Sequence, residues 1–182
     1  MVGKNFSFSP FRVCKHIELR LVEIEDCEFI LNLRTDPELN KYISPVNNDL
    51  ESQKAWIQSY KKREANSMEY YFIIQSLNGN PFGTVRMYDF RGGSFCWGSW
   101  LIARNTPFFV AIESSLSIYE LGFFTLGFDK SHFDVRKNNI RVVRFHQQFG
   151  ARLINEDDEN YYFNFERFEY ENTKKRYSRF LR

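Results

Sequence analysis

The chain has 182 residues, with 25 basic and 23 acidic side chains and a formal net charge of +2. This length suits one domain with its own core, and the near balance of charge counts against a nucleic-acid binder. Aromatic residues make up 18% of the sequence, against only 9 glycines and 5 prolines, which excludes a disordered or low-complexity protein.

The sequence carries no membrane or metal pattern. No apolar run approaches the roughly 18 residues needed to span a bilayer, and residues 1–10 lack the apolar stretch of a signal peptide. We therefore expect a cytoplasmic protein that binds no membrane. The cysteines are odd in number and widely spaced, which disfavours disulfides and a zinc site and predicts ordinary buried residues at Cys14, Cys27 and Cys96.

The residue pattern in the N-terminal third of the chain predicts one strand and two helices. Residues 16–22 alternate between apolar and charged side chains, which is the period of a half-buried strand. A first helix is expected over 26–36, and a further helical turn over 39–42 is left open. A second helix begins near Asp49 and closes in a basic turn, where the helix dipole favours cations.

The middle of the chain predicts an antiparallel meander. Two runs rich in β-branched and aromatic residues, 70–76 and 83–90, are joined by a segment that contains Asn78-Gly79, a strong hairpin signal. A third strand is expected over 95–102. Three consecutive strands in one sheet follow from this pattern.

A change of period after Pro107 predicts a helix. Apolar side chains recur every three or four residues as far as Phe123, and Pro107 suits the first turn. A short strand over 132–135 and a second helix over 139–149 follow. Gly150 stands at the position where a helix end prefers glycine.

The C-terminal part predicts a closing hairpin over 151–166 around an acidic turn. The last sixteen residues, 167–182, are basic and aromatic and show no clear period, so they are expected to form a tail. We expect a single domain over 1–182 with its core at about 16–166. Its class is α/β (α+β), and its elements follow the order βααβββαβαββ.

One segment near the C-terminal end, residues 135–151, carries a specific pattern. Val135 ends a strand and stands four residues before Asn139, and the following helix ends at Gly150. This segment resembles the C-terminal motif of the GNAT acetyltransferase superfamily. Further segments resemble the family's third and fourth strands, or its branch of ribosomal-protein and sugar-nucleotide N-acetyltransferases: 19–21, 34–37, 53–57, 83–85 and 97–102.

The resemblance implies a fold and an activity. The fold would be a mixed, mostly antiparallel sheet flanked by helices, in which strands four and five splay apart to admit acetyl-CoA. The activity would be transfer of an acetyl group from acetyl-CoA, the co-substrate, to a primary amine. By position in the family pattern, the cofactor-binding residues would be Leu101, Ile102, Ala103, Thr106, Phe109, Val110, Ala111, Asn139, Val142 and Phe145.

The expected phosphate-binding loop, residues 104–111, departs from the family pattern. Both of its usual glycines are absent, Pro107 has no N–H, and Phe109 adds bulk. Two interpretations follow. Backbone amides of residues 109–111, with the Thr106 hydroxyl, still hold an anion, because N–H groups rather than glycines bind it. Alternatively, the cofactor site has degenerated.

The resemblance places His146 where a tyrosine of the family often protonates the leaving thiolate. His146 is therefore the candidate catalytic residue, and the competing interpretation is a histidine with a purely structural place. The family's strand-four glutamate is replaced by Cys96. Deprotonation of the amine would then pass through water, through His146 or through Asp89. A pairing of His132 with Asp134 on one strand face is a weaker possibility.

The same branch implies a small-molecule amine as partner, most specifically an amino sugar carried on a nucleotide in bacterial surface-polysaccharide biosynthesis. The residues expected to bind this substrate offer aromatic rings, a cation and a carboxylate, and they are Trp56, Arg86, Tyr88, Asp89 and Trp97. The competing interpretation is that such aromatic residues belong to the core. Alternative functions are acetylation of a protein N-terminus or small amine, or a non-catalytic acyl-CoA-binding or assembly domain, and a homodimer is left open.

Overall fold

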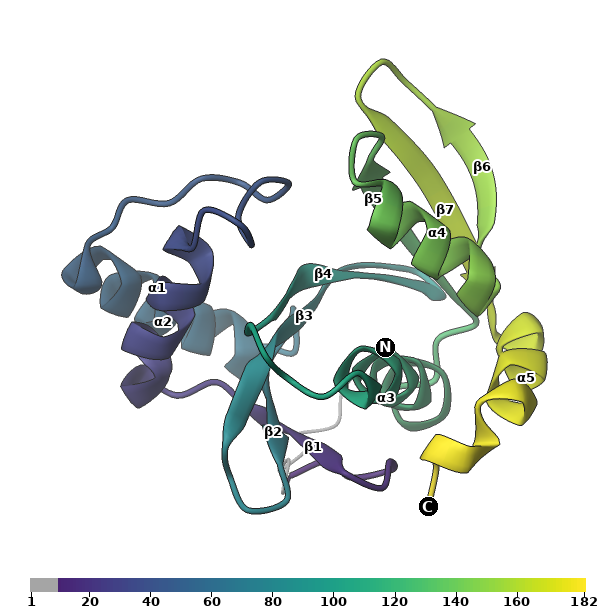
Figure 1. Ribbon diagram of the computed structural model, residues 1–182, viewed down its shortest axis with the longest axis horizontal. Helices are drawn as coiled ribbons and strands as arrows, with labels where there is room; N and C mark the ends of the chain where they lie inside the picture. Colours follow the sequence, from purple (N-terminus) through teal and green to yellow (C-terminus); the bar gives the residue numbers. More distant parts are fainter. Residues whose placement is uncertain (1–9) are drawn as a thin grey trace.

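A computed structural model describes residues 10–182, so the residues 1–9 used in the signal-peptide argument lie outside the described part. The strands and helices follow one another along the chain (Figure 1) as β1 Ile17–Leu21, α1 Cys27–Thr35, α2 Leu50–Ala65, β2 Tyr70–Ser76, β3 Pro81–Arg91, β4 Ser94–Ile102, α3 Phe109–Glu120, β5 Lys130–Arg136, α4 Ile140–Phe149, β6 Arg152–Glu156, β7 Asn160–Glu166 and α5 Arg167–Arg176. A π-helical segment, Leu121–Thr125, extends α3. No helix in the described part is long and apolar enough to cross a membrane.

The strands form one sheet in the order β1-β2-β3-β4-β5-β7-β6. All neighbours run antiparallel except β4 and β5, which are parallel. These two strands pair only at Ser94 with Lys130 and at Phe95 with Ser131, and then diverge (Figure 1). The expected splay of strands four and five is therefore present, and it opens the middle of the sheet.

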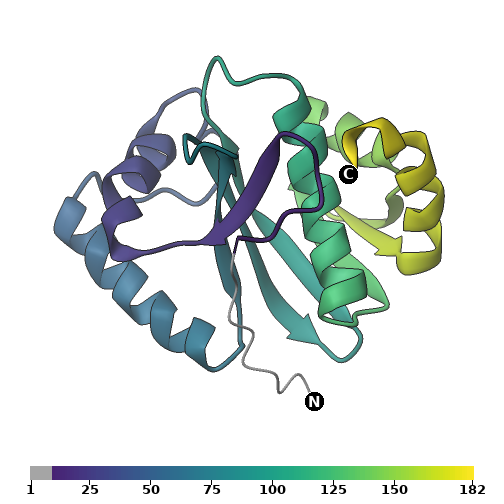
Figure 2. The ribbon, with the colours of Figure 1, turned by 90° about the horizontal axis from the view of Figure 1, so that it is seen from below.

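Helices cover both faces of the first half of the sheet. On one face α1 and α2 bury Ile30, Ile57 and Tyr60 against Tyr71 and Ile73 of β2. On the other face α3 lies beside β1, as Figure 2 shows. Burial of these side chains on two faces explains why β2 reads as a continuous apolar run rather than as an alternating strand.

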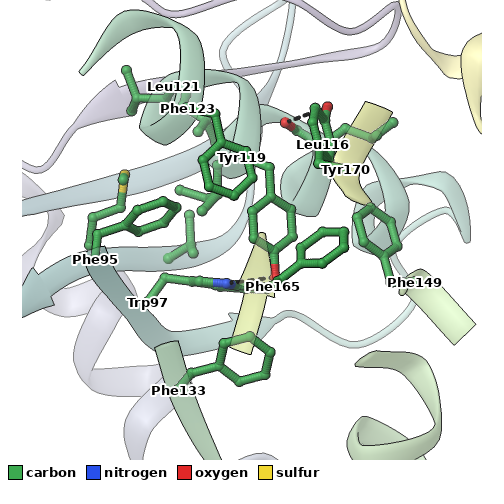
Figure 3. Packing of buried hydrophobic residues seen from close by; sticks show 14 of the residues in the cluster. Phe95, Trp97, Leu116, Tyr119, Leu121, Phe123, Phe133, Phe149, Phe165 and Tyr170 are labelled. Atoms are coloured by element: carbon green, nitrogen blue, oxygen red, sulfur yellow. Dashed lines mark hydrogen bonds between the residues drawn. The ribbon is translucent and has the colours of Figure 1, made fainter. Parts of the chain in front are cut away.

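Much of the high aromatic content lies in the larger core cluster. Tyr119 of α3 stands among the rings of Phe123, Phe149 and Phe165, with centroids 4.7–5.7 Å apart. The indole N–H of Trp97 donates to the Tyr119 hydroxyl at 3.1 Å (Figure 3). Edge-to-face and offset contacts of this kind add to the stabilisation that burial alone provides.

Most of the predicted elements are confirmed, and three are corrected. The hairpin between β2 and β3 and the helix end at Gly150, whose φ is +118°, are as predicted. Residues 36–43, however, form turns rather than a further helical turn. Pro107 precedes the N-cap Phe108 instead of entering the helix. The segment 167–182 contains α5, where a tail without regular structure was expected.

Candidate active site

Two adjoining cavities lie at the splayed centre of the sheet. The β4–β5 cavity, of about 310 Å³, lies between the diverging strands and is also lined by α4. The α2–β3 cavity, of about 540 Å³, lies between these two elements and the loop from α1 to α2. Four residues line both cavities: Arg34, Ser44, Tyr88 and Ser99. The two cavities therefore form one cleft in which two ligands could meet.

His146 of α4 lines the β4–β5 cavity, where the two strands diverge. Its ring is 4% exposed and lies 4.4 Å from the Phe133 ring and 5.3 Å from the Trp97 ring. Its Nδ1 atom is buried and has no hydrogen-bond partner among the described residues. Burial lowers the pKa of His146 to about 3, because the surrounding rings cannot solvate a charge. The imidazole is therefore neutral near pH 7.

Most of the α4 candidates implied by the family pattern lie at the cavity. Asn139 and Val142 line the β4–β5 cavity together with His146. Phe145 does not line it but packs against Trp100, with ring centroids 5.2 Å apart. Three of the four α4 candidates implied by the family pattern therefore line the cavity, and Phe145 packs against Trp100, which also lines it.

A bulge in β4 lies where the two cavities meet. Thr84 pairs with Leu101, and Arg86 pairs with Gly98, so two β4 residues stand opposite one β3 residue. One of the two is Ser99, whose φ is +46°. A bulge leaves backbone groups out of the strand ladder, and such groups are free to bind a ligand.

The α2–β3 cavity contains two cations and several flat rings. Arg34 and Arg86 line it together with Trp56, Tyr71 and Tyr88, and no carboxylate is among its lining residues in the described chain. Of the residues predicted to bind substrate, Trp56, Arg86 and Tyr88 therefore lie here. Polar amides and hydroxyls complete the lining at Ser44, Asn47, Ser52, Gln53 and Ser99.

Arg86 is held in a fixed orientation. Its guanidinium forms an ion pair with buried Glu69, which also accepts a 2.8 Å hydrogen bond from Arg63. The Arg86 guanidinium also lies 5.4 Å from the Trp56 ring and 4.9 Å from the Tyr88 ring. Its Nε atom is buried without a partner. The buried Nε atom is out of reach of a ligand, but other guanidinium N–H groups of the oriented Arg86 side chain can bind an anionic or carbonyl-bearing ligand in the cavity that it lines.

The loop between α1 and α2 supplies lining residues that sequence reasoning missed. Arg34, at the end of α1, donates to the Ser44 carbonyl at 3.0 Å and so anchors this loop near the cleft. Asp36 forms an ion pair of 2.5 Å with Arg104, which precedes α3. A long irregular connection between two helices is a recognised signal for a functional loop, and here it was available in the sequence.

The two phenylalanines of the glycine-free segment stand at the start of α3, Phe108 as its N-cap and Phe109 as its first residue. Phe108 is 77% exposed, and the Phe109 ring packs against His16 at 4.5 Å. Thr106 donates its hydroxyl to the Ala103 carbonyl, and the Val110 amide donates to Pro107. These bonds leave the amides of Phe109 and Ala111 as the donors best placed for an anion at this helix start.

The other predicted cofactor-side residues do not line either cavity. They are Leu101, Ile102, Ala103, Thr106, Phe109, Val110 and Ala111, and they lie along the end of β4 and the start of α3. Trp97 lines the β4–β5 cavity, but it is 4% exposed and its N–H is used by Tyr119. Trp97 therefore forms part of the cavity wall but exposes too little of its ring for a ligand to stack on it.

The remaining candidates for proton transfer lie elsewhere or are unsuited to act as a base. Asp89 lines neither cavity and pairs with Arg91 at 2.6 Å, as a strand-end charge partner would. His132 contacts Asp89 at 3.3 Å and Ser94 at 2.6 Å, so its partners differ from the suggested Asp134. Burial raises the pKa of Cys96 to about 11, so its thiol stays protonated near neutral pH.

A protein-family model described as an acetyltransferase (GNAT) domain matches residues 16–152. The chain belongs to the GNAT acetyltransferase family. A structure of apo FdhC, described as a nucleotide-linked sugar GNAT, is 48% identical and superimposes with a TM-score of 0.85, covering 94% of this chain and 99% of that one. The two proteins are therefore similar over nearly their whole length.

A more distant relative shows the shared fold alone. It is a spermidine N-acetyltransferase from Vibrio cholerae, solved with CoA and spermine, at 18% identity and a TM-score of 0.72, covering 86% of this chain and 98% of that one. No curated protein matches the sequence significantly. The chain thus combines an acetyltransferase fold with a cleft whose α2–β3 cavity is lined by two arginines and three aromatic rings.

Proposed function

We propose that this GNAT acetyltransferase transfers the acetyl group of acetyl-CoA to the amine of a nucleotide-linked amino sugar, in bacterial surface-polysaccharide biosynthesis. The lining of the α2–β3 cavity is the observation that carries this proposal. Two arginines and no lining carboxylate favour an anionic ligand such as a nucleoside diphosphate, and Trp56 offers a partly exposed ring to a base or a sugar. The similarity to a nucleotide-linked sugar GNAT supports the same substrate class.

The charge of this cavity also argues against a polyamine. A substrate with several ammonium groups would meet Arg34 and Arg86, whereas the carboxylate that pairs with Arg86, that of Glu69, is buried and lines neither cavity. Like charges in a partly enclosed cleft repel more strongly than in water. The alternative acceptors, a protein N-terminus and a small amine, lack the anionic group that the arginines would bind.

The reaction needs the two substrates to meet at the β4 bulge. Acetyl-CoA, with its thioester between β4 and β5, would lie on the His146 side of the cleft, and the acceptor would lie on the Arg86 side. The amine nitrogen then forms a bond to the thioester carbonyl carbon, the carbon–sulfur bond breaks, and the thiolate leaves with the electron pair. Because His146 is neutral, it would assist as a hydrogen-bond donor to the sulfur or the carbonyl oxygen rather than as an imidazolium acid.

Acceptor screening with acetyl-CoA tests the proposal. The released CoA thiol is titrated with UDP- and dTDP-linked amino sugars, the matching amino-sugar phosphates without a nucleoside, a peptide with a free N-terminus, and spermidine. We expect release only with nucleotide-linked amino sugars. Release with spermidine or the peptide alone would overturn the substrate class. Failure of millimolar acetyl-CoA to raise the melting temperature would overturn the acetyltransferase function itself.

A further inference from the structure

One residue of the cleft has an unusual backbone conformation. The non-glycine residues with positive φ in the described chain are Ser67, Asp89, Ser99 and Asn105. Of these four, only Ser99 lines either of the two cavities of the cleft, and it lines both. A side chain other than glycine in this conformation costs stability, of the order of 1–3 kcal/mol, and such strain gathers at functional sites. Glycine would adopt this backbone conformation without that cost, so the presence of serine here suggests that its side chain has a function.

The surroundings hold Ser99 in this conformation. Ser99 is one of the two β4 residues in the bulge, where the pairing of β3 with β4 is interrupted. Thr84 is fully buried, and its hydroxyl donates a hydrogen bond of 3.0 Å to the Ser99 carbonyl. A β-carbon at the neighbouring Gly98 would lie 3.0 Å from the Tyr88 hydroxyl, a tight contact that Tyr88 would have to relieve. The Ser99 carbonyl of β4 is thus held by a side chain of β3, at the place where the acetyl donor and the acceptor would meet.

The Ser99 hydroxyl is free to act on a substrate. It makes no hydrogen bond to any described residue, whereas the hydroxyls of Thr84, Ser114 and Ser115 all bond to backbone carbonyls. The other proton acceptors of the cleft are poor. Burial lowers the pKa of His146 to about 3, which makes its imidazole a weak base, and Cys96, whose thiol burial keeps protonated, lines neither cavity. The one carboxylate on the cleft wall is that of exposed Asp134, on the β5 side.

We propose that the Ser99 hydroxyl is a catalytic group of this enzyme, which accepts a hydrogen bond from the acceptor amine and passes its proton to solvent. As the amine nitrogen bonds to the thioester carbon, its N–H proton moves to the Ser99 oxygen while the serine O–H proton moves to a water molecule, so the serine ends unchanged. The thiolate takes the electron pair of the broken carbon–sulfur bond. This role rests on the proposed acyl transfer to an amine but not on which amine is used.

The test compares glycine and alanine variants at Ser99 with a matched control. Ser99→Gly removes the hydroxyl and relieves the positive φ, and Ser99→Ala removes the hydroxyl and keeps the strained β-carbon. Ser67→Gly relieves the same kind of strain outside both cavities. The kcat, the KM of each substrate and the melting temperature are measured with any acceptor that supports thiol release by the unchanged protein.

We expect kcat to fall by at least about tenfold in both Ser99 variants, in the range usual for proton-transfer groups. The KM for acetyl-CoA should stay within about twofold, and Ser99→Gly should melt no lower than the unchanged protein. Ser67→Gly should retain full kcat. A Ser99→Gly variant with near-normal kcat, or one that loses acetyl-CoA affinity as well, would overturn the proposal, as would loss of kcat in Asp134→Asn alone. Absence of thiol release by the unchanged protein with every amine would instead refute the acetyltransferase function.

Discussion

Burial of His146 in the cavity wall makes the free energy of unfolding depend on pH. In the unfolded chain its pKa is near 6.5, and in the fold burial lowers the pKa to about 3. Above pH 6.5 both states are neutral, and this group does not make stability depend on pH. Below pH 6.5 the unfolded chain binds a proton that the folded chain does not, so stability falls as pH falls toward 3.

Replacement of His146 by phenylalanine should remove this dependence. Between pH 7 and pH 5 the histidine costs about 2 kcal/mol of unfolding free energy, and a phenylalanine among the same rings costs nothing of this kind. Urea unfolding of both proteins at the two pH values measures the difference. His16 and His132 remain in both proteins and cancel in the comparison. Equal losses in the two proteins would mean that His146 is charged in the fold.

Arg86 lines the α2–β3 cavity, where we propose that the acceptor binds, and its charge alone does not describe its contribution. A lysine would keep the charge but could not pair with Glu69, stack between two rings and present a further donor at once. Arg86→Lys should therefore raise the KM for a nucleotide-linked amino sugar by about tenfold or more, which corresponds to at least about 1.4 kcal/mol. The KM for acetyl-CoA should change little.

Arg91→Lys is the control for this change in steady-state kinetics. Arg91 stands on the same strand, is 70% exposed in its side chain and lines neither cavity. Arg91→Lys should leave the KM values for the acceptor and for acetyl-CoA within about twofold of those of the unchanged protein, because exposed ion pairs contribute little. Similar KM values in the Arg86 and Arg91 variants would contradict a role for Arg86 in binding the acceptor.

Among the elements, α2 depends on a single side chain for its start. The Asp49 carboxylate accepts a 2.8 Å hydrogen bond from the Ser52 amide, and Gln53 and Trp56 in the next turns line the α2–β3 cavity. Asp49→Ala should lower the free energy of unfolding by about 1 kcal/mol. Urea unfolding measures this loss, and Asp49→Ser, which also caps a helix, should recover most of it. An equally destabilised serine variant would show that the cap itself contributes little.

Elements whose signals are local could be predicted from the sequence. The Asn78-Gly79 turn, the alternation in β1 and the glycine that ends α4 each act within a few residues, so their structural effect follows from the chain alone. The helix α5 was missed because its buried face holds few apolar residues and includes Thr173. A capping box of Glu166 and Glu169 marks its start and was readable in the sequence.

The site could be predicted only where the family pattern fixes positions along one element. Asn139, Val142 and His146 share one helix face, and their common place at the cavity follows from that spacing. Arg34 and Ser44 reach the same cleft through the packing of α1 and of the loop after it, which no local pattern encodes. The strain at Ser99 likewise arises from the pairing of two strands and cannot be read from one of them.

At the scale of the whole molecule, the C-terminal segment closes the core. Tyr170 of α5 is fully buried, its ring lies 5.6 Å from that of Tyr119, and its hydroxyl donates to Glu120 of α3 at 2.9 Å. Lys174 forms an ion pair of 2.7 Å with the same carboxylate. The last residues also reach the start of the chain, where Leu181 bridges to Cys14. The Thr173 hydroxyl of α5 donates to the Phe149 carbonyl at the end of α4, so the segment joins α3, α4 and the N-terminal region into one packed unit.

Removal of the Tyr170 side chain should destabilise the whole fold and not only α5. Tyr170→Ala removes a large buried ring and leaves Glu120 with one partner fewer, so it should cost about 3–5 kcal/mol. Tyr170→Phe keeps the ring and should cost only about 1–2 kcal/mol. Phe168→Ala on the same helix is the control, because Phe168 is 65% exposed, and it should change stability by less than about 0.5 kcal/mol. Urea unfolding, followed by tryptophan fluorescence and by circular dichroism, should give one coincident transition in each variant. A separate early transition confined to the helix signal would show instead that α5 is an appendage that the core does not need.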